Sequence, residues 1–277
     1  MCVEIVWFRQ DLIPAFVAET QKEGWLIDEF EIERTIARFP TSSFALLVDG
    51  KLAGGITTYF HEKTAWIGNF LVFPEYRKHG YGKRLFETVL KELDGQKSIY
   101  LNANPLLKKF YKSYGFNECI EVIRLKSKKE LSNKAFTGFG ETEQKTMPQI
   151  AMKLDGEFFC EDRGVYLSED AISKSSIYFA TPNGFLHSRM IGGIAFVGPF
   201  EVRSGAYLDA ERMFREFLHF RGMKEICLDV PKIDEILSFF VGYGFEESSR
   251  TMQMVKGEDM FVEYENIYAF ASAGSLG

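Results

Sequence analysis

The sequence predicts an α/β fold in two related halves, each with a mixed sheet flanked by helices. Segments with strand periodicity alternate along the chain with amphipathic helical stripes. Asp49-Gly50, a dipeptide typical of two-residue turns, separates two strand-like runs and indicates a β-hairpin. The tripeptide Tyr-Gly-Phe occurs at 114–116 and again at 243–245, each time after a helical stripe, which indicates an internal repeat of domain size.

The first half, residues 1–127, is predicted to form one α/β domain. Its helices are recognised by apolar side chains three and four residues apart, such as Leu85, Phe86 and Val89. Gly115 is suited to end the helix before it, because glycine readily adopts the left-handed conformation found after helices. The expected order is strand 3–7, helices 12–25 and 28–39, strands 43–48, 51–60 and 64–72, helix 83–93, strand 98–102, helix 106–114 and strand 119–125.

Residues 128–148 are rich in Lys, Glu, Thr, Gly and Ser and are predicted to form a linker. Residues 149–277 are then expected to form the second domain. Its pattern predicts a strand that ends at Gly198-Pro199, a helix with its apolar stripe over 213–218, a strand at 226–230 and a helix over 233–240.

Composition excludes several classes of protein. A chain of 277 residues with 46% apolar and 26% charged residues suits one or two soluble domains, and a net charge of −6 argues against a nucleic-acid partner. The chain contains no apolar run of 18 residues and no basic secretory n-region at its start, so neither a membrane span nor a secretory signal is expected. The four cysteines lie far apart, which favours reduced thiols in a cytoplasmic protein and no metal site.

The segment 70–83 carries the strongest chemical signals. A strand ends, a turn containing Gly80 and Gly82 follows, and an amphipathic helix begins. The free amides and the dipole at a helix start attract an anion, and Arg77, Lys78 and Lys83 add positive charge. The segment is neither a Walker loop nor a dinucleotide fingerprint, because GxxxxGK[ST] and a third glycine are missing.

The order of motifs resembles the GNAT superfamily of acetyl-CoA-dependent N-acetyltransferases. The pattern V-x-P-x-x-R-x-x-G-x-G is followed by an amphipathic helix, a strand, an Asn and F-Y-x-x-x-G-F, all within residues 1–127. Arg77, Gly80 and Gly82 match the family's phosphate-binding motif Q/R-x-x-G-x-G/A. The resemblance implies GNAT-like domains of α+β type with mostly antiparallel sheets, acetyl-CoA as co-substrate and no metal.

The resemblance also implies cofactor-binding residues. Phe70, Leu71 and Val72 would present backbone groups to the pantetheine arm, which in this family lies between two diverging parallel strands. Asn104, seven residues before Tyr111, matches an Asn that often contacts the cofactor, and Asn102 is the alternative. The backbone of the glycine-containing turn would bind the pyrophosphate through Arg77, Lys78, His79, Gly80, Tyr81, Gly82 and Lys83.

Tyr111 matches the family's frequent general-acid tyrosine. A phenol with a pKa near 10 can protonate a departing thiolate, although Tyr111 is alternatively a core aromatic residue on a buried helix face. The general base is not identified by the sequence, because the strand expected at 64–72 has no carboxylate. The weaker candidates, each more typical of solvated surface, are Asp28, Glu29, Glu31, Glu33 and His61.

The second half resembles a degenerate GNAT-like domain. Gly205 is retained, but Tyr207 stands where Gly82 does, and Phe240 stands where Tyr111 does. The whole chain therefore resembles bacterial tandem GNAT proteins, with an intact N-terminal copy and a degenerate C-terminal copy.

The function implied is transfer of an acetyl group from acetyl-CoA to a primary amine of a small molecule or peptide, by direct attack in a ternary complex. The alternatives are a non-catalytic acyl-CoA-binding sensor or interaction module and an aminoacyl-tRNA-dependent transferase. The sequence identifies neither the acceptor nor the oligomeric state.

Overall fold

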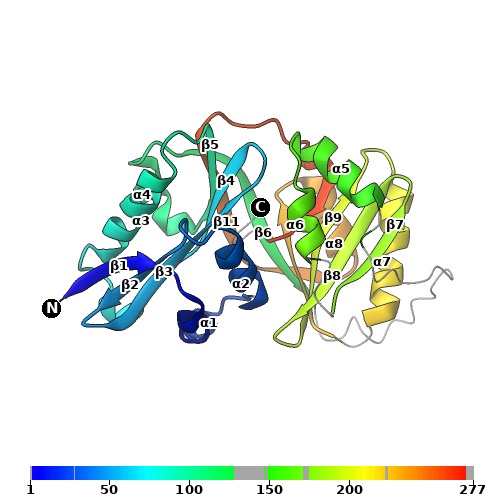
Figure 1. Cartoon of the computed structure of the whole chain (residues 1–277). Coiled ribbons are helices and arrows are strands. Elements are labelled where there is room, and N and C mark those ends of the chain that lie inside the picture. Colours follow the sequence, from blue (N-terminus) through cyan, green and yellow to red (C-terminus); the bar gives the residue numbers. More distant parts are fainter. Residues whose placement is uncertain are drawn as a thin grey trace. The chain divides into compact units, whose positions relative to one another are not determined.

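A computed structural model describes residues 2–27, 29–127, 147, 149–170, 175–221 and 224–272 (Figure 1). Their contacts divide the chain into two compact units, one of residues 2–102 and 255–258 and one of residues 103–254 and 259–272. The domain boundary expected at 127 stays a prediction. Apart from Met147, the expected linker lies outside the described residues.

The first unit is built on a sheet with the strand order β1-β2-β3-β4-β5, in which only the last pair is parallel. This confirms the expected mixed, mostly antiparallel sheet. The hairpin at Asp49-Gly50 is also confirmed, with φ of 48° and 76° at its two residues, as a type I′ turn requires. The strands are β1 (Val3–Trp7), β2 (Phe44–Val48), β3 (Lys51–Phe60), β4 (Thr64–Val72) and β5 (Ser98–Ala103), and the helices are α1 (Ile13–Lys22), α2 (Glu29–Arg38) and α3 (Tyr81–Glu92).

Strand β4 contributes to the core on both of its faces. The ring of Phe70 stacks on that of Phe86 from α3, with their centroids 5.6 Å apart. Leu71 points to the opposite face and joins the apolar cluster of α1 and α2 that contains Phe16 and Ile32. This alternation follows from the two-residue period of a strand and fixes β4 between two helical layers.

A segment from late in the sequence completes the first unit. The backbone N–H of Glu258 donates to the carbonyl of Lys97 at 2.9 Å, and the hydroxyl of Ser98 donates to the carbonyl of Glu258 at 2.8 Å. Residues 255–258 therefore lie against the start of β5, although about 160 residues separate them in the chain.

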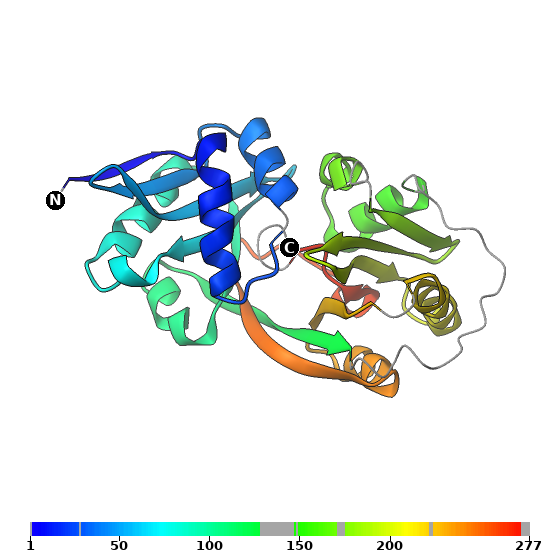
Figure 2. The same ribbon diagram turned by 90° about the horizontal axis from the view of Figure 1, so that it is seen from below.

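The second unit contains a sheet with the order β11-β6-β10-β9-β8-β7, with β12 paired to β9. Helices α5 and α6 cover one face of this sheet, and α7 and α8 cover the other (Figure 2). β6, which was expected as the last strand of the first half, pairs antiparallel with β10. The elements are α4 (Lys108–Lys112), β6 (Asn117–Ser127), α5 (Gln149–Phe159), α6 (Gly164–Asp170), β7 (Ile177–Thr181), β8 (Gly184–Ile191), β9 (Ile194–Val202), α7 (Tyr207–Arg221), β10 (Ile226–Pro231), α8 (Asp234–Gly242), β11 (Phe245–Gly257) and β12 (Ile267–Ala269).

The prediction that a strand ends at Gly198-Pro199 is wrong. β9 continues to Val202, and beyond the proline Phe200 pairs with Leu186 of β8. The register of the ladder shifts between Leu186 and Ser188, so Gly198-Pro199 forms a bulge within the strand. A bulge tolerates proline because it does not require every N–H of the ladder.

Three fully buried charged side chains connect α5 and β9. Arg163 Nε lies 3.2 Å from Asp155 Oδ2, and the guanidinium of Arg163 stacks over the ring of Phe159 at 3.6 Å from its centroid. Glu201 is buried beside them. Burial, and after it the charge of Asp155, raise the pKa of Glu201 well above its usual value.

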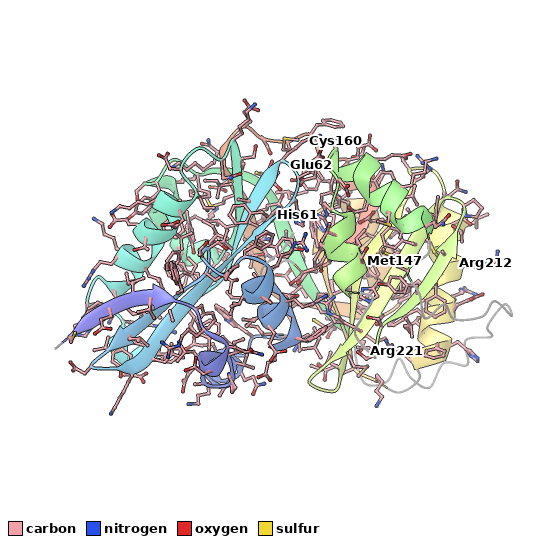
Figure 3. The ribbon with its side chains drawn as sticks, viewed as in Figure 1. His61, Glu62, Met147, Cys160, Arg212 and Arg221 are labelled. Atoms are coloured by element: carbon pink, nitrogen blue, oxygen red, sulfur yellow. The ribbon has the colours of Figure 1, made fainter. Side chains whose placement is uncertain are left out.

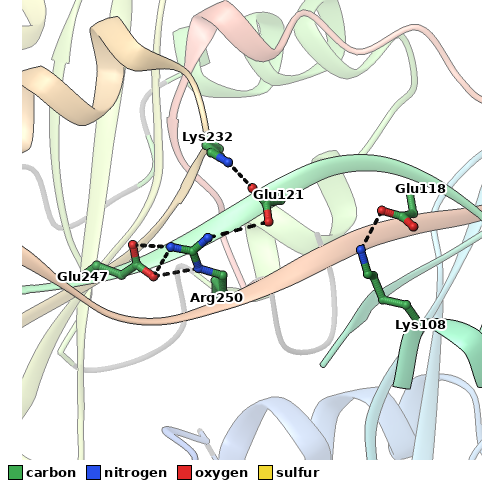
Figure 4. A network of polar contacts seen from close by, with 6 residues as sticks. All are labelled: Lys108, Glu118, Glu121, Lys232, Glu247 and Arg250. Carbon is green, nitrogen blue, oxygen red and sulfur yellow. Dashed lines mark hydrogen bonds and ion pairs between the residues drawn. The ribbon is translucent and has the colours of Figure 1, made fainter. Parts of the chain in front are cut away.

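The outer surface of β6 and β11 carries a network of ion pairs (Figure 4). Glu121 accepts a hydrogen bond from Lys232 and lies 3.8 Å from Arg250, which also pairs with Glu247 at 2.8 Å. Lys108 of α4 pairs with Glu118 at 2.9 Å. These side chains are partly exposed, so the network lies on a solvent-facing surface. Ion pairs of this kind contribute little to stability. In the described part of the chain, no helix is both long and apolar enough to cross a membrane.

Candidate active site

The two parallel strands of the first unit run together and then diverge. β4 pairs with β5 from Thr64–Ser98 to Ile67–Leu101. Just after Ile67, past the pair Gly68–Thr57, the register of β4 against β3 shifts at a bulge formed by Asn69 and Phe70. We call the diverging backbone edges, residues 68–72 of β4 and Asn102 of β5, the first fork.

Asn69 holds the bulge that opens the first fork. Its φ is 50°, a left-handed conformation that asparagine tolerates better than most residues, and its Nδ2 donates to Thr57 Oγ1 of β3 at 3.0 Å. The bulge bends β4 away from the ladder with β5. Asn69 was not among the predicted site residues. The glycine before it, Gly68, lies inside a strand pattern and is a signal of a bulge.

The first fork offers polar groups to a ligand. Because successive strand residues direct their amides to opposite sides, part of the β4 edge faces the fork and not β3. At the end of β5, the side-chain oxygen of Asn102 is buried and has no hydrogen-bond partner among the described residues. A buried polar atom without a partner costs about 1–3 kcal/mol, so a ligand that donates a hydrogen bond there is favoured.

The glycine-containing turn lies against the fork. Gly80 has a φ of 79° at the start of α3, and a Cβ placed on it would meet nothing within 4 Å. A Cβ on Gly82 would lie 3.5 Å from Val72 and 3.7 Å from Phe70, both on the fork strand. The first helical bond runs from Arg84 N to the carbonyl of Gly80, so the amides of the first turn precede the helical ladder.

The side chain of Arg77 connects the turn to β4 and α1. Its Nε donates to the carbonyl of Val72 at 2.8 Å, and its guanidinium pairs with Glu23 at 2.8 Å. The Arg77 backbone N–H already donates to the carbonyl of Pro74 at 3.3 Å. Arg77 therefore ties the turn to β4 and α1, while its N–H is engaged within the protein.

Among the remaining predicted residues, Lys78, His79 and Lys83 are exposed and Tyr81 is buried. His79 Nδ1 lies 2.8 Å from the carbonyl of Arg77, and its ring stacks on that of Tyr81. Lys78 is exposed in a left-handed conformation, with a φ of 66°, and Lys83 is exposed 3.8 Å from Glu87. The structure thus brings together the predicted residues of β4 and of the turn, with two exposed lysines beside the helix start.

Asn104 and Tyr111 belong to the second unit. Asn104 Oδ1 accepts the N–H of Leu106 at 3.0 Å and so caps the turn at Pro105–Leu107. Tyr111 is buried on α4, and its ring packs edge-on against Phe110. Burial raises the pKa of the Tyr111 phenol, which keeps the phenol protonated at neutral pH as a general acid requires. The same burial agrees with a core aromatic residue.

The described candidates for a general base lie on α2 and in the turn between β3 and β4. Glu29 is exposed and Glu31 is buried on α2, where Glu33 is half-buried. His61 lies in the turn between β3 and β4 (Figure 3), with its ring centroid 5.1 Å from that of Tyr59. Asp28 lies outside the described residues. β4 itself carries no carboxylate or imidazole, so no base is assigned from it.

The first unit is thus a mixed α/β domain in which a fork of parallel strands lies beside a glycine-containing helix start. Residues 7–116 match the family model of the acetyltransferase (GNAT) family. Among curated proteins, UPF0039 protein C11D3.02c from Schizosaccharomyces pombe is 34% identical over 65 residues. That match covers 22% of this chain and 43% of the yeast protein, less than half of its length.

Solved structures similar to the whole chain show that it has the fold of tandem GNAT proteins. A Pyrococcus horikoshii protein, provisionally assigned as an acetyltransferase, is 18% identical with a TM-score of 0.84, over 99% of this chain and 95% of that chain. A GCN5-related N-acetyltransferase from Sphaerobacter thermophilus is 14% identical with a TM-score of 0.65, over 94% and 98%. A tandem GNAT protein from the clavulanic acid biosynthesis pathway is 12% identical with a TM-score of 0.66, over 93% and 100%.

Proposed function

We propose that this chain is an N-acetyltransferase that moves an acetyl group from acetyl-CoA to a primary amine of a small molecule or peptide. The observation that carries the proposal is the position of the glycine-containing turn against the first fork, inside the segment matched by the GNAT family. Gly82 lies in contact distance of Phe70 and Val72, so one extended ligand can reach both the strand edge and the helix start.

The residues present fit this co-substrate. A pantetheine arm contains amides, which complement the unpaired edge of β4 at Phe70–Val72 and the buried Oδ1 of Asn102. A pyrophosphate is an anion, and the first turn of α3 offers amides and a positive dipole end beside Lys78 and Lys83. Asn104 stays a proposed contact, with its side-chain oxygen engaged in a cap and its amide nitrogen the group left to bind.

When bound, acetyl-CoA supplies an acetyl thioester whose thiolate can leave. Backbone N–H groups of β4 near Leu71 and Val72 stabilise negative charge on the carbonyl oxygen. Tyr111, assigned on its match to F-Y-x-x-x-G-F, donates its phenolic proton to the departing sulfur, and the proton that the attacking nitrogen loses restores the phenol. The amine attacks directly in a ternary complex, and no cysteine lies in the turn to form a covalent intermediate.

The test is thiol release from acetyl-CoA with a panel of acceptors: spermidine, a neutral aromatic amine, free amino acids and lysine-containing peptides. N-acetyltransferase activity requires release that depends on one class of amine, with the acetylated product seen by mass spectrometry. Tight binding of acetyl-CoA without release from any acceptor would favour the sensor or interaction module. Transfer from aminoacyl-tRNA without use of acetyl-CoA would favour the tRNA-dependent transferase.

The proposal includes a cytoplasmic location. Cys2, Cys119, Cys160 and Cys227 are all free thiols in the structure, and Cys227 is buried. Free thiols agree with a reducing compartment. Fractionation of cells that express the tagged protein tests this part.

A further inference from the structure

The second unit repeats the fork of parallel strands. β9 and β10 pair in parallel from Ala195–Ile226 to Val197–Leu228. A bulge at Gly198-Pro199 follows directly, and in β4 the bulge at Asn69-Phe70 likewise follows the last pair with β5, after one intervening residue. We call the diverging edges, residues 198–202 of β9 and Asp229 of β10, the second fork.

The second fork is closed by the protein's own chain. β12 pairs antiparallel with β9, with Ile267 opposite Glu201 and Ala269 opposite Phe200. On the other side, the backbone N–H of Phe270 donates to the carbonyl of Asp229 at 2.8 Å. One peptide segment therefore hydrogen-bonds to both edges of the fork, and it satisfies backbone groups that a fork leaves unpaired.

The same segment also engages the turn that leads into α7. Gly205 has a φ of 84°, close to the 79° of Gly80 at the start of α3. The amide N–H just before it, that of Ser204, donates to Asn266 Oδ1 at 2.6 Å. Arg203, the only basic residue of the turn, is paired with Glu157. A neutral side-chain oxygen of the segment thus accepts a hydrogen bond from the turn that leads into α7.

The segment 266–271 is an integral part of the second unit. Ile267, Ala269, Phe270 and Ala271 are buried. Gly198 approaches it so closely that a Cβ there would lie 1.9 Å from the carbonyl oxygen of Phe270.

The fully buried Arg189 joins the fork to the segment. Its Nη1 donates to the carbonyl of Gly198 at 3.5 Å and to that of Ala271 at 3.4 Å. A buried guanidinium needs carbonyl partners, and one of these comes from the segment itself.

We propose that residues 266–271 are the permanent peptide ligand of the second fork, which makes the second unit a site for an extended peptide strand and leaves the chain one coenzyme A site. The segment supplies amides to both strand edges and the Asn266 oxygen to the turn before α7, so that it contacts both the strand edges and the glycine-containing turn of this unit. The comparison with coenzyme A rests on the proposed function, whereas the peptide site rests on the second unit alone.

The first experiment measures hydrogen exchange in the full chain. Gly198→Ala places a methyl group on the Phe270 carbonyl and displaces the segment, whereas Gly242→Ala in α8 meets nothing within 4 Å and is the matched control. Amides of residues 267–270 should exchange slowly in the parent chain and in the control, and at least tenfold faster in Gly198→Ala. Fast exchange in the parent, or no change in Gly198→Ala, would overturn the proposal.

A second measurement covers the case in which Gly198→Ala does not fold. A protease site inserted between Met260 and the exposed Phe261 allows the folded chain to be cut before the segment. Co-elution of the cut tail with the body, or its separation followed by rebinding of a synthetic peptide of residues 261–277, supports the peptide site. Separation without rebinding at 1 mM peptide contradicts it. An Asn266→Ala peptide should bind about fivefold more weakly, because one hydrogen bond is lost.

Calorimetry with coenzyme A separates this proposal from the proposed function. One site per chain is expected, and two equal sites would overturn the assignment of the second fork to a peptide. Absence of acetyl transfer with an intact peptide site would count against the proposed function alone.

Discussion

Replacing Gly82 by Asp should stabilise the ligand-free protein and weaken coenzyme A binding at the same time. Gly82 is the second residue of α3, and a Cβ there makes only ordinary contacts, at 3.5 Å and 3.7 Å. Loss of a helical glycine and gain of a carboxylate in the first turn together add about 0.5–1.5 kcal/mol to the free energy of unfolding. For a unit of this size, the Tm should rise by about 2–6 °C.

The effect on binding has the opposite sign. A carboxylate about 5 Å from a phosphate repels it by about 1–3 kcal/mol at effective dielectric constants of about 20 to 80. Each 1.4 kcal/mol changes the Kd by about tenfold, so the Kd for coenzyme A should rise by about five- to one-hundred-fold. The repulsion should shrink as salt is added, because the site is open to solvent.

Calorimetry tests the expected rise in Kd, and thermal unfolding of the same samples tests the expected rise in Tm. Gly82→Asn has a side chain of the same shape without the charge and should lose much less affinity. Gln96→Asp adds the same charge in the exposed connection that follows α3 and should leave the Kd unchanged. If Gly82→Asp binds coenzyme A as tightly as the parent, or if Asp and Asn weaken it equally at every salt concentration, an anion site at this turn is refuted.

Tyr111→Phe should lower kcat at least tenfold with an unchanged Kd for coenzyme A. Phe240→Tyr in the second unit is the control and should leave kcat unchanged. Equal kcat values for Tyr111→Phe and the parent would contradict the general-acid role. Asn102→Ala should weaken coenzyme A binding by about two- to tenfold in calorimetry without lowering the Tm, because Asn102 Oδ1 has no hydrogen-bond partner within the described part of the chain. Asn104→Ala removes a turn cap and should lower the free energy of unfolding by about 1 kcal/mol in urea titrations. Because the pKa of Glu201 is raised in the native state, the unfolded chain loses a proton above about pH 4.5 that the native chain keeps, so stability falls as pH rises. Glu201→Gln should flatten this loss above about pH 4.5, and an unchanged slope in urea unfolding would contradict the assignment.

The elements of the first half were predictable because their signals are local. The bounds of β3 and β4 equal the predicted 51–60 and 64–72, since the Asp49-Gly50 turn and the strand periodicity lie within a short stretch of sequence. The strand end predicted at Gly198-Pro199 failed because a proline looks the same at a strand end and at a bulge. Only the pairing of Phe200 with β8 separates the two cases.

The sequence motif of the candidate site could be predicted, but the residues that hold its side chains in place could not. Gly80 and Gly82 stand in a recognisable spacing next to a helix start. The role of Arg77 depends on Glu23, which is 54 residues away, and the conformation of Asn69 depends on Thr57 on the neighbouring strand. Such partners are chosen by the tertiary fold, so the side-chain geometry of the site cannot be inferred from local sequence.

The position of residues 255–258 against β5 affects how the chain folds. The contact between Ser98 and Glu258 spans 160 residues, and closing so long a loop is slow relative to local hairpins. Until that segment has been synthesised, β5 has an open backbone edge, and open edges pair with other chains. A fragment ending at residue 127 would keep this edge open permanently. We therefore expect such a fragment to aggregate even though it contains the whole segment matched by the GNAT family.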